Sequence, residues 1–215
     1  MADSLPPSRP FARPLKRPWY LMAALVAAWI YGARLMGDGY EQLAFFRGES
    51  PDIHAYTDGI TGAEARDAAL AAGEHWLTVR ESAKRREMPF GAASLLLGGV
   101  MVLFAARSMA AREGSRSALV QVVVVNAAVM IASFALTRDV AVAEAAFETK
   151  ISEGMKPALM SHLGTADDRR RGEALAPFLS LLMRDAFSAL IVIALTRPRA
   201  RAFFREPEPG PLSER

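Results

Sequence analysis

Hydrophobic residues along the chain gather into four long runs that are separated by segments rich in charge. Each run is about 20 residues long, which is the length of helix that crosses a hydrocarbon layer of about 30 Å. With a positive mean hydropathy over 215 residues, the chain is too apolar for a soluble domain and too short for a large transporter. The pattern therefore predicts an all-α fold, a four-span transmembrane helical bundle. The predicted spans are residues 18–36, 89–106, 118–136 and 177–196.

The basic residues next to these spans predict the orientation of the bundle. Arginines and lysine are in excess in three segments beside the spans, residues 1–17, 107–117 and 197–215. The two longer loops, 37–88 and 154–176, mix acids with bases. Because short basic segments stay in the cytoplasm, we predict that both termini are cytoplasmic and that the two long loops lie on the outer side.

Composition indicates the kind of organism that the protein comes from and the nature of the two ends of the chain. Arginine supplies 22 of the 26 basic residues, and together with the many alanines this suggests a GC-rich bacterial genome and thus a bacterial inner membrane. The proline-rich ends of the chain cannot bury a core and are predicted to be disordered. Basic residues ahead of the first run also occur in signal peptides, but its length and aromatic content favour a span.

A helical hairpin is predicted beyond the membrane, on the outer side. Residues 118–153 contain no glycine or proline, so the third span should continue as one helix to about residue 153. Thr61 and Glu64 form a capping-box pattern that opens a second helix over about 62–87. Small residues recur along this second helix at heptad-like spacing. The seam consists of Ala65, Ala69, Ala72, Trp76, Val79 and Ala83.

This seam has two interpretations. The favoured one is that it closes the protein's own hairpin against the extended third helix. The alternative is a docking face for a partner helix, with Trp76 as its anchor, because large aromatic residues are common interface anchors.

Arg184 and Asp185 interrupt the fourth span. Each such residue at a helix centre costs about 2.5 to 3.5 kcal/mol on insertion. Adjacent helix positions point about 100° apart, so the two side chains need partners on other helices. The favoured interpretation is a polar clamp within the bundle; a clamp to a partner's helix and a proton or ion relay are the alternatives. The candidate partners are Arg34, Ser133, Asn126 and Gln121.

Motifs of catalysis and metal binding are missing from the sequence. There are no cysteines, and His54, His75 and His162 do not have the spacing of a zinc site. The glycines at 37 and 39 indicate the start of a loop, and Gly98 and Gly99 indicate a close helix contact. We therefore expect a protein that is not an enzyme and needs no cofactor or metal.

The carboxyl-terminal arginines are predicted to anchor the protein to anionic lipid headgroups. They alternate with phenylalanines directly after the fourth span, a composition that suits a lipid surface. The segment is short and follows a membrane span, so no nucleic-acid partner is expected. The anchor consists of Arg197, Arg199, Arg201 and Arg205.

From the sequence, the leading hypothesis is a non-catalytic subunit or scaffold of a membrane assembly. Its partners would be the lipid bilayer and either another membrane protein or further copies of the chain. The alternative is a small transport or ion-coupled component that uses the Arg184/Asp185 pair.

Overall fold

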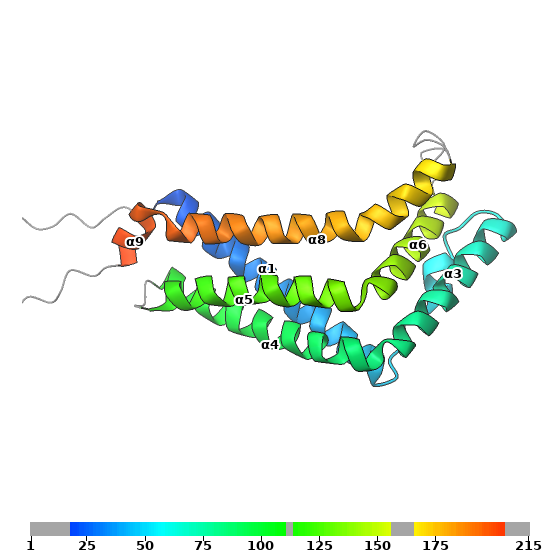
Figure 1. The fold of residues 1–215 in the computed structure, drawn as a ribbon, viewed down its shortest axis with the longest axis horizontal. Coiled ribbons are helices and arrows are strands. Elements are labelled where there is room, and N and C mark those ends of the chain that lie inside the picture. The colour runs from blue at the N-terminus through cyan, green and yellow to red at the C-terminus, as the bar shows by residue number, and fades with distance from the viewer. Residues whose placement is uncertain (1–17, 111–113, 156–165, 205–215) are drawn as a thin grey trace, which may run out of the picture.

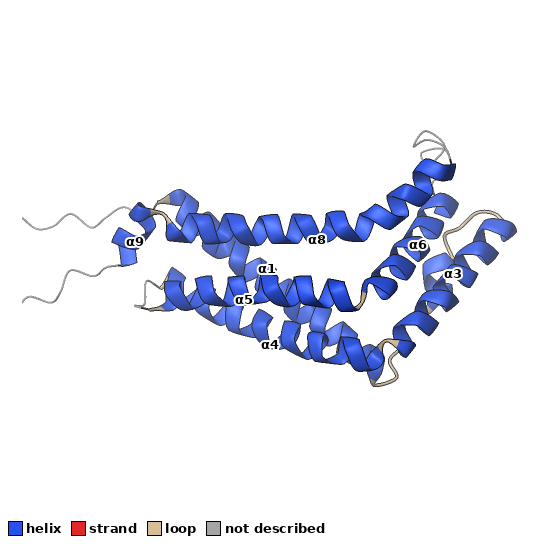
Figure 2. Cartoon of the chain, in the orientation of Figure 1, coloured by secondary structure: helices blue, strands red, loops and turns tan. Residues whose placement is uncertain are grey.

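The structure, a computed structural model, describes residues 18–110, 114–155 and 166–204. Within these residues every regular element is a helix (Figure 2). Four of these helices, α1, α4, α5 and α8, carry stretches long and apolar enough to cross a membrane, so the predicted four-span, all-α architecture is confirmed. The helices are α1 (Trp19–Phe46), α2 (Ile53–Thr57), α3 (Ala63–Ser82), α4 (Lys84–Met109), α5 (Ser115–Leu136), α6 (Arg138–Met155), α8 (Ala166–Thr196) and α9 (Pro198–Phe204).

The four long helices form one bundle, and the shorter helices lie at its two ends (Figure 1). Helices α3 and α6 pack against each other beyond the ends of α4 and α5. We call this the hairpin end. Helix α9 lies at the opposite end, called the α9 end, where α4 ends and α5 begins.

Two glycines on α1 and two on α4 bring these antiparallel helices into backbone contact. A Cβ atom on Gly98 would lie 2.6 Å from the carbonyl oxygen of Gly32, and one on Gly39 would lie 2.7 Å from that of Gly91. Real Cβ atoms do not approach backbone so closely, so only glycine fits at this helix crossing. The close contact expected at Gly98 is present, whereas Gly39 belongs to the crossing and not to a loop.

Apolar side chains form a separate core in each half of the molecule. The bundle core lies between the four long helices, towards the α9 end. It includes Leu25, Met101 and Leu119, which are fully or almost fully buried. The core of the hairpin end centres on Trp76 of α3 and Phe147 of α6, whose rings stack with centroids 5.6 Å apart. The small-residue seam of α3 therefore faces α6 of the same chain.

The helix boundaries differ from those expected in several places. The outer helix predicted over about 62–87 ends at Ser82, and α4 begins at Lys84 and not at residue 89. Helix α1 continues ten residues beyond the predicted end of its span, to Phe46, and α8 begins at Ala166, so both long loops are shorter than expected. The single helix expected over 118–153 is divided at Thr137, whose backbone leaves helical geometry (φ −125°, ψ 26°). The Thr137 hydroxyl donates to the carbonyl oxygen of Ser133 at 2.8 Å. Such back-bonding by threonine bends helices without any glycine or proline.

Candidate functional site

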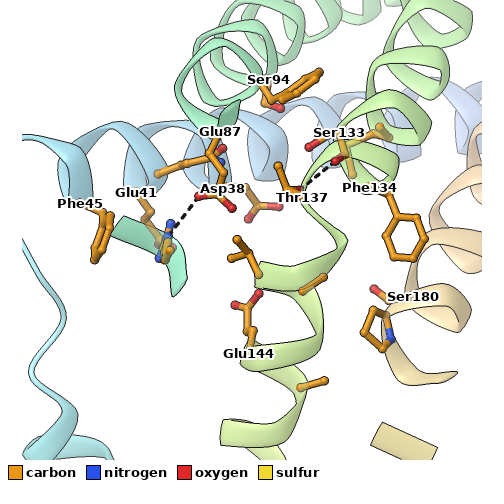
Figure 3. Close-up of a pocket in the computed structure, with 18 of the residues that line it drawn as sticks. Asp38, Glu41, Phe45, Glu87, Ser94, Ser133, Phe134, Thr137, Glu144 and Ser180 are labelled. Atoms are coloured by element: carbon orange, nitrogen blue, oxygen red, sulfur yellow. Dashed lines mark hydrogen bonds and ion pairs between the residues drawn. The ribbon is translucent and has the colours of Figure 1, made fainter. Parts of the chain in front are cut away.

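A cavity of about 840 Å³ lies where the bundle meets the hairpin end. Its walls come from α1, the segment after it, α2, α3, α4, α5, α6 and α8. The cavity spans the level at which α5 ends and α6 begins. Figure 3 shows carboxyl groups from three of these helices around the same space, with Asp38 on α1, Glu87 on α4 and Glu144 on α6.

The described lining of this cavity is acidic. Six carboxylates line it against three guanidinium groups, which leaves a formal excess of three negative charges. Aromatic rings complete the wall and give it apolar surface. The carboxylates are Asp38, Glu41, Glu49, Glu87, Glu144 and Glu148; the guanidinium groups are Arg34, Arg80 and Arg184; the rings are Tyr40, Phe45, Tyr56, Trp76, Phe90 and Phe134.

Arg80 is held firmly in the wall. Its guanidinium lies over the ring of Phe45, 4.4 Å from the centroid, and 5.4 Å from that of Trp76. Its Nε lies 3.5 Å from Oε2 of Glu87, whose side chain is only 7% exposed. A buried carboxylate needs such a partner, because removing a charge from water is costly unless the charge is paired. Arg80 and Glu87 therefore neutralise one another.

Arg184, the intramembrane arginine noted in the sequence, is paired with Asp38 of α1. Its Nη2 lies 3.7 Å from Oδ2 of Asp38, and the same oxygen lies 4.0 Å from Nε of Arg34 one turn earlier on α1. The interaction joins α8 to α1 within the chain. Asp38 was not among the expected partners because the glycines beside it indicated a loop, whereas α1 continues through them.

Asp185 lies apart from this cluster. It is not part of the cavity lining, and its carboxylate makes no hydrogen bond or ion pair with any residue that the structure describes. Arg184 and Asp185 thus point to different surroundings, as their adjacent positions on one helix require.

The other candidate partners are distributed over the bundle. Ser133 lines the cavity, whereas Gln121 is exposed on α5. Asn126 is fully buried and its Nδ2 donates to the hydroxyl of Tyr31 at 3.4 Å, away from both charges. Of the four candidates, Arg34 and Ser133 share the cavity with Arg184 and the other two do not.

Four of the cavity carboxylates have no opposite charge within 4.0 Å among the described residues, namely Glu41, Glu49, Glu144 and Glu148. The pKa of Glu144 is raised above its ordinary value, first by desolvation within the cavity and second by the charge of Glu148. Arg80 and Arg184 act in the opposite direction but do not cancel the effect. The electrostatic surroundings of Glu144 therefore favour an added positive charge.

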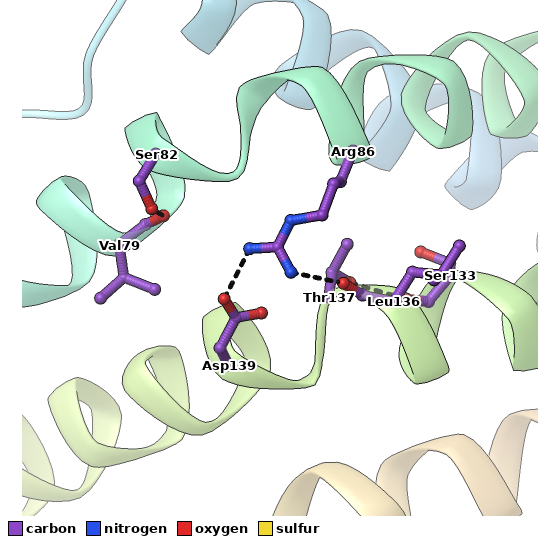
Figure 4. A network of polar contacts seen from close by, with 7 residues as sticks. All are labelled: Val79, Ser82, Arg86, Ser133, Leu136, Thr137 and Asp139. Atoms are coloured by element: carbon purple, nitrogen blue, oxygen red, sulfur yellow. Dashed lines mark hydrogen bonds and ion pairs between the residues drawn. The ribbon is translucent and has the colours of Figure 1, made fainter.

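Arg86, near the start of α4, reaches the break between α5 and α6 beside the cavity (Figure 4). Its Nη2 donates to Oδ2 of Asp139 at 2.6 Å and its Nη1 donates to the carbonyl oxygen of Leu136 at 2.9 Å. In a continuous helix the carbonyl oxygen of Leu136 would accept from the N–H of Val140. Here that N–H donates to the carbonyl oxygen of Thr137, so the Leu136 carbonyl is left for Arg86. The hydrogen bond from Arg86 and its positive charge lower the pKa of Asp139. Arg86 thus fastens the bend of α5 and α6 to the start of α4.

The remaining predicted residues take no part in the cavity, apart from Trp76 of the seam. Arg197 lies over the ring of Tyr20, 5.4 Å from its centroid, and Arg201 lines a second pocket at the α9 end. Arg199 is exposed on α9. Arg205, His162 and both proline-rich tails lie outside the described residues. No group of three or more metal-ligating side chains is found within the described part of the chain.

Comparison with known proteins finds no family model, no curated protein and no solved structure that matches the chain. Its function must therefore be inferred from the cavity and the bundle themselves.

Proposed function

We propose that the protein is a non-catalytic subunit of a bacterial inner-membrane assembly that binds a positively charged group of its partner in the acidic cavity. In this proposal both termini are cytoplasmic and the hairpin end is on the outer side, as the basic flanking residues favour. The observation that carries the proposal is the excess of carboxylates over guanidinium groups around the cavity.

The chemistry of the wall suits an organic cation better than a metal ion. The four carboxylates without an ion-pair partner are spread over α1, the segment after it and α6, too widely for one ion, and the described residues contain no candidate metal group. Aromatic rings line the same space, and their faces attract ammonium and guanidinium groups. A lysine or arginine side chain on a partner segment carries the positive charge that the carboxylates attract and the cationic group that the aromatic faces bind.

Glu144 and Glu148 are the residues with which to test this proposal. Neither has an ion-pair partner within the described residues, so replacing both by glutamine removes charge from the cavity without breaking an internal contact. Glu74 of α3 is exposed and lies outside the cavity lining, so Glu74→Gln is a matched control.

The test is purification from native membranes in a gentle detergent, with mass spectrometry of whatever elutes in fixed proportion. We expect a stoichiometric partner with the wild type and with Glu74→Gln, and a much reduced share with the Glu144→Gln, Glu148→Gln double variant. A wild-type protein that elutes alone and well folded would refute the proposal. Equal retention of the partner by the double variant would refute the role of the cavity.

An ion-coupled transport component is the second candidate. The cavity reaches between the spans as far as Arg184 and Ser94, which favours this function. Against it, the bundle core towards the α9 end is made of fully buried apolar side chains, such as Met101, Leu119 and Leu195. Ion or proton flux in proteoliposomes that is lost in Asp38→Asn would support the second candidate over the first.

A further inference from the structure

The second pocket of the molecule, at the α9 end, has the opposite charge from the acidic cavity. It has a volume of about 420 Å³ and lies between the start of α5, the end of α8 and helix α9. Two arginines line it, Arg116 from α5 and Arg201 from α9, and its described lining holds no carboxylate. The proposed function makes no use of this pocket.

The two guanidinium groups face one pocket, and the described residues that line it carry no opposite charge. Because both line the same pocket, their like charges repel one another. Arg116 donates one hydrogen bond, from Nη1 to the carbonyl oxygen of Leu195 at 3.0 Å, and a guanidinium group has five N–H donors. The side chain of Arg201 has no hydrogen bond or ion pair within the described residues. Both groups therefore have donors available for a bound anion, which would also relieve their repulsion.

The start of α5 adds to the attraction of this pocket for an anion. Gly114 precedes the helix in a left-handed conformation (φ 74°) and contributes no side chain to the start of the helix. Helix N-termini carry partial positive charge and bind phosphate and carboxylate groups. The hydroxyl-bearing Ser117 also lines the pocket.

We propose that this pocket binds the phosphate group of an anionic phospholipid. Guanidinium groups match phosphate oxygens in pairs of hydrogen bonds, and basic pockets between membrane helices hold lipid headgroups. The pocket lies at the ends of two spans, α5 and α8, where headgroups are found, and Val120 and Phe204 give it apolar surface for the adjoining part of a lipid. A free phosphate ion would use the same donors, but it has no use for the apolar wall.

The test is native mass spectrometry of the full chain in detergent, titrated with phosphatidylglycerol and with phosphatidylcholine of the same acyl chains. We expect tighter binding of phosphatidylglycerol. Arg201→Gln should weaken that binding about ten-fold, because it removes a charged hydrogen-bond donor. Arg107→Gln changes an exposed arginine near the end of α4, at the same end of the molecule but outside the pocket lining, and should alter the binding less than about two-fold.

Two results would overturn the proposal. Equal losses in Arg201→Gln and Arg107→Gln would mean that general surface charge attracts the lipid. Displacement of phosphatidylglycerol by an equal concentration of inorganic phosphate would assign the pocket to a free anion. Arg116→Gln is a weaker probe because it also removes the hydrogen bond to Leu195, so Arg201 carries the test.

Discussion

The crossing of α1 and α4 predicts a sharp difference between two neighbouring glycines, Gly98 and Gly99. A Cβ atom on Gly98 would lie 2.6 Å from the carbonyl oxygen of Gly32 and 2.7 Å from the backbone nitrogen of Met36. A Cβ atom on Gly99 would meet only the sulfur of Met36, at 3.8 Å, which is ordinary van der Waals contact. Gly98→Ala therefore has to push two backbones apart, whereas Gly99→Ala fits as the helix stands.

The magnitude follows from two terms. Both substitutions gain the helix preference of alanine over glycine, about 1 kcal/mol in soluble helices, so this term cancels between them. Overpacking costs about 1 to 3 kcal/mol, and here the obstacles are backbone atoms that cannot rotate away. We therefore expect Gly98→Ala to be about 1 to 3 kcal/mol less stable than Gly99→Ala.

The assay is reversible unfolding of the purified chain in mixed micelles, followed by circular dichroism as the denaturing detergent increases. A second matched pair lies on α1, since a Cβ atom on Gly39 would approach Leu95 N to 2.6 Å, while one on Gly37 meets nothing within 4 Å. The same order of stability is expected there. Equal stability of the two variants in each pair would refute the inferred backbone contact.

Three other perturbations test the contacts around the cavity. Asp38→Asn should lower stability by about 1 kcal/mol, and combining it with Arg184→Leu should cost less than the sum of the two single effects in a double-mutant cycle. Asp139→Asn should cost less than about 1 kcal/mol because its ion pair with Arg86 is half-exposed. Since folding lowers the pKa of Asp139, its contribution is complete above its ordinary pKa of about 3.9 and is lost as the pH falls through the lower folded value. The stability difference between wild type and Asp139→Asn should therefore be complete at about pH 6 and vanish once the pH is below the folded pKa of Asp139. Trp76→Ala should lower stability by about 3 kcal/mol and expose the hairpin to limited proteolysis, whereas Trp76→Phe, which keeps a ring against Phe147, should resist cleavage.

Hydropathy was sufficient to predict the four spans because a membrane requires about 20 apolar residues in a row, whatever the tertiary structure. The interior of α1 was harder to read. Glycine favours both loops and close helix contacts, and the pattern around Asp38 does not distinguish them. Only the position of α4 shows that Gly39 is required for packing. Once α1 is known to continue, Arg34 and Asp38 fall one turn apart and the pairing of Arg184 with Asp38 becomes intelligible.

The division at Thr137 could not be read from helix-breaking residues, because the segment has none. The break depends on a distant residue: Arg86 of α4 donates to the carbonyl oxygen of Leu136 at the end of α5 and pairs with Asp139 just beyond the break. Without such a donor, an unpaired carbonyl near the membrane would be costly. The same bend turns α6 so that Glu144 and Glu148 line a space shared with α1 and α8. The acidic cavity is thus a product of tertiary structure, assembled from carboxylates that appear in the sequence only as separate charges.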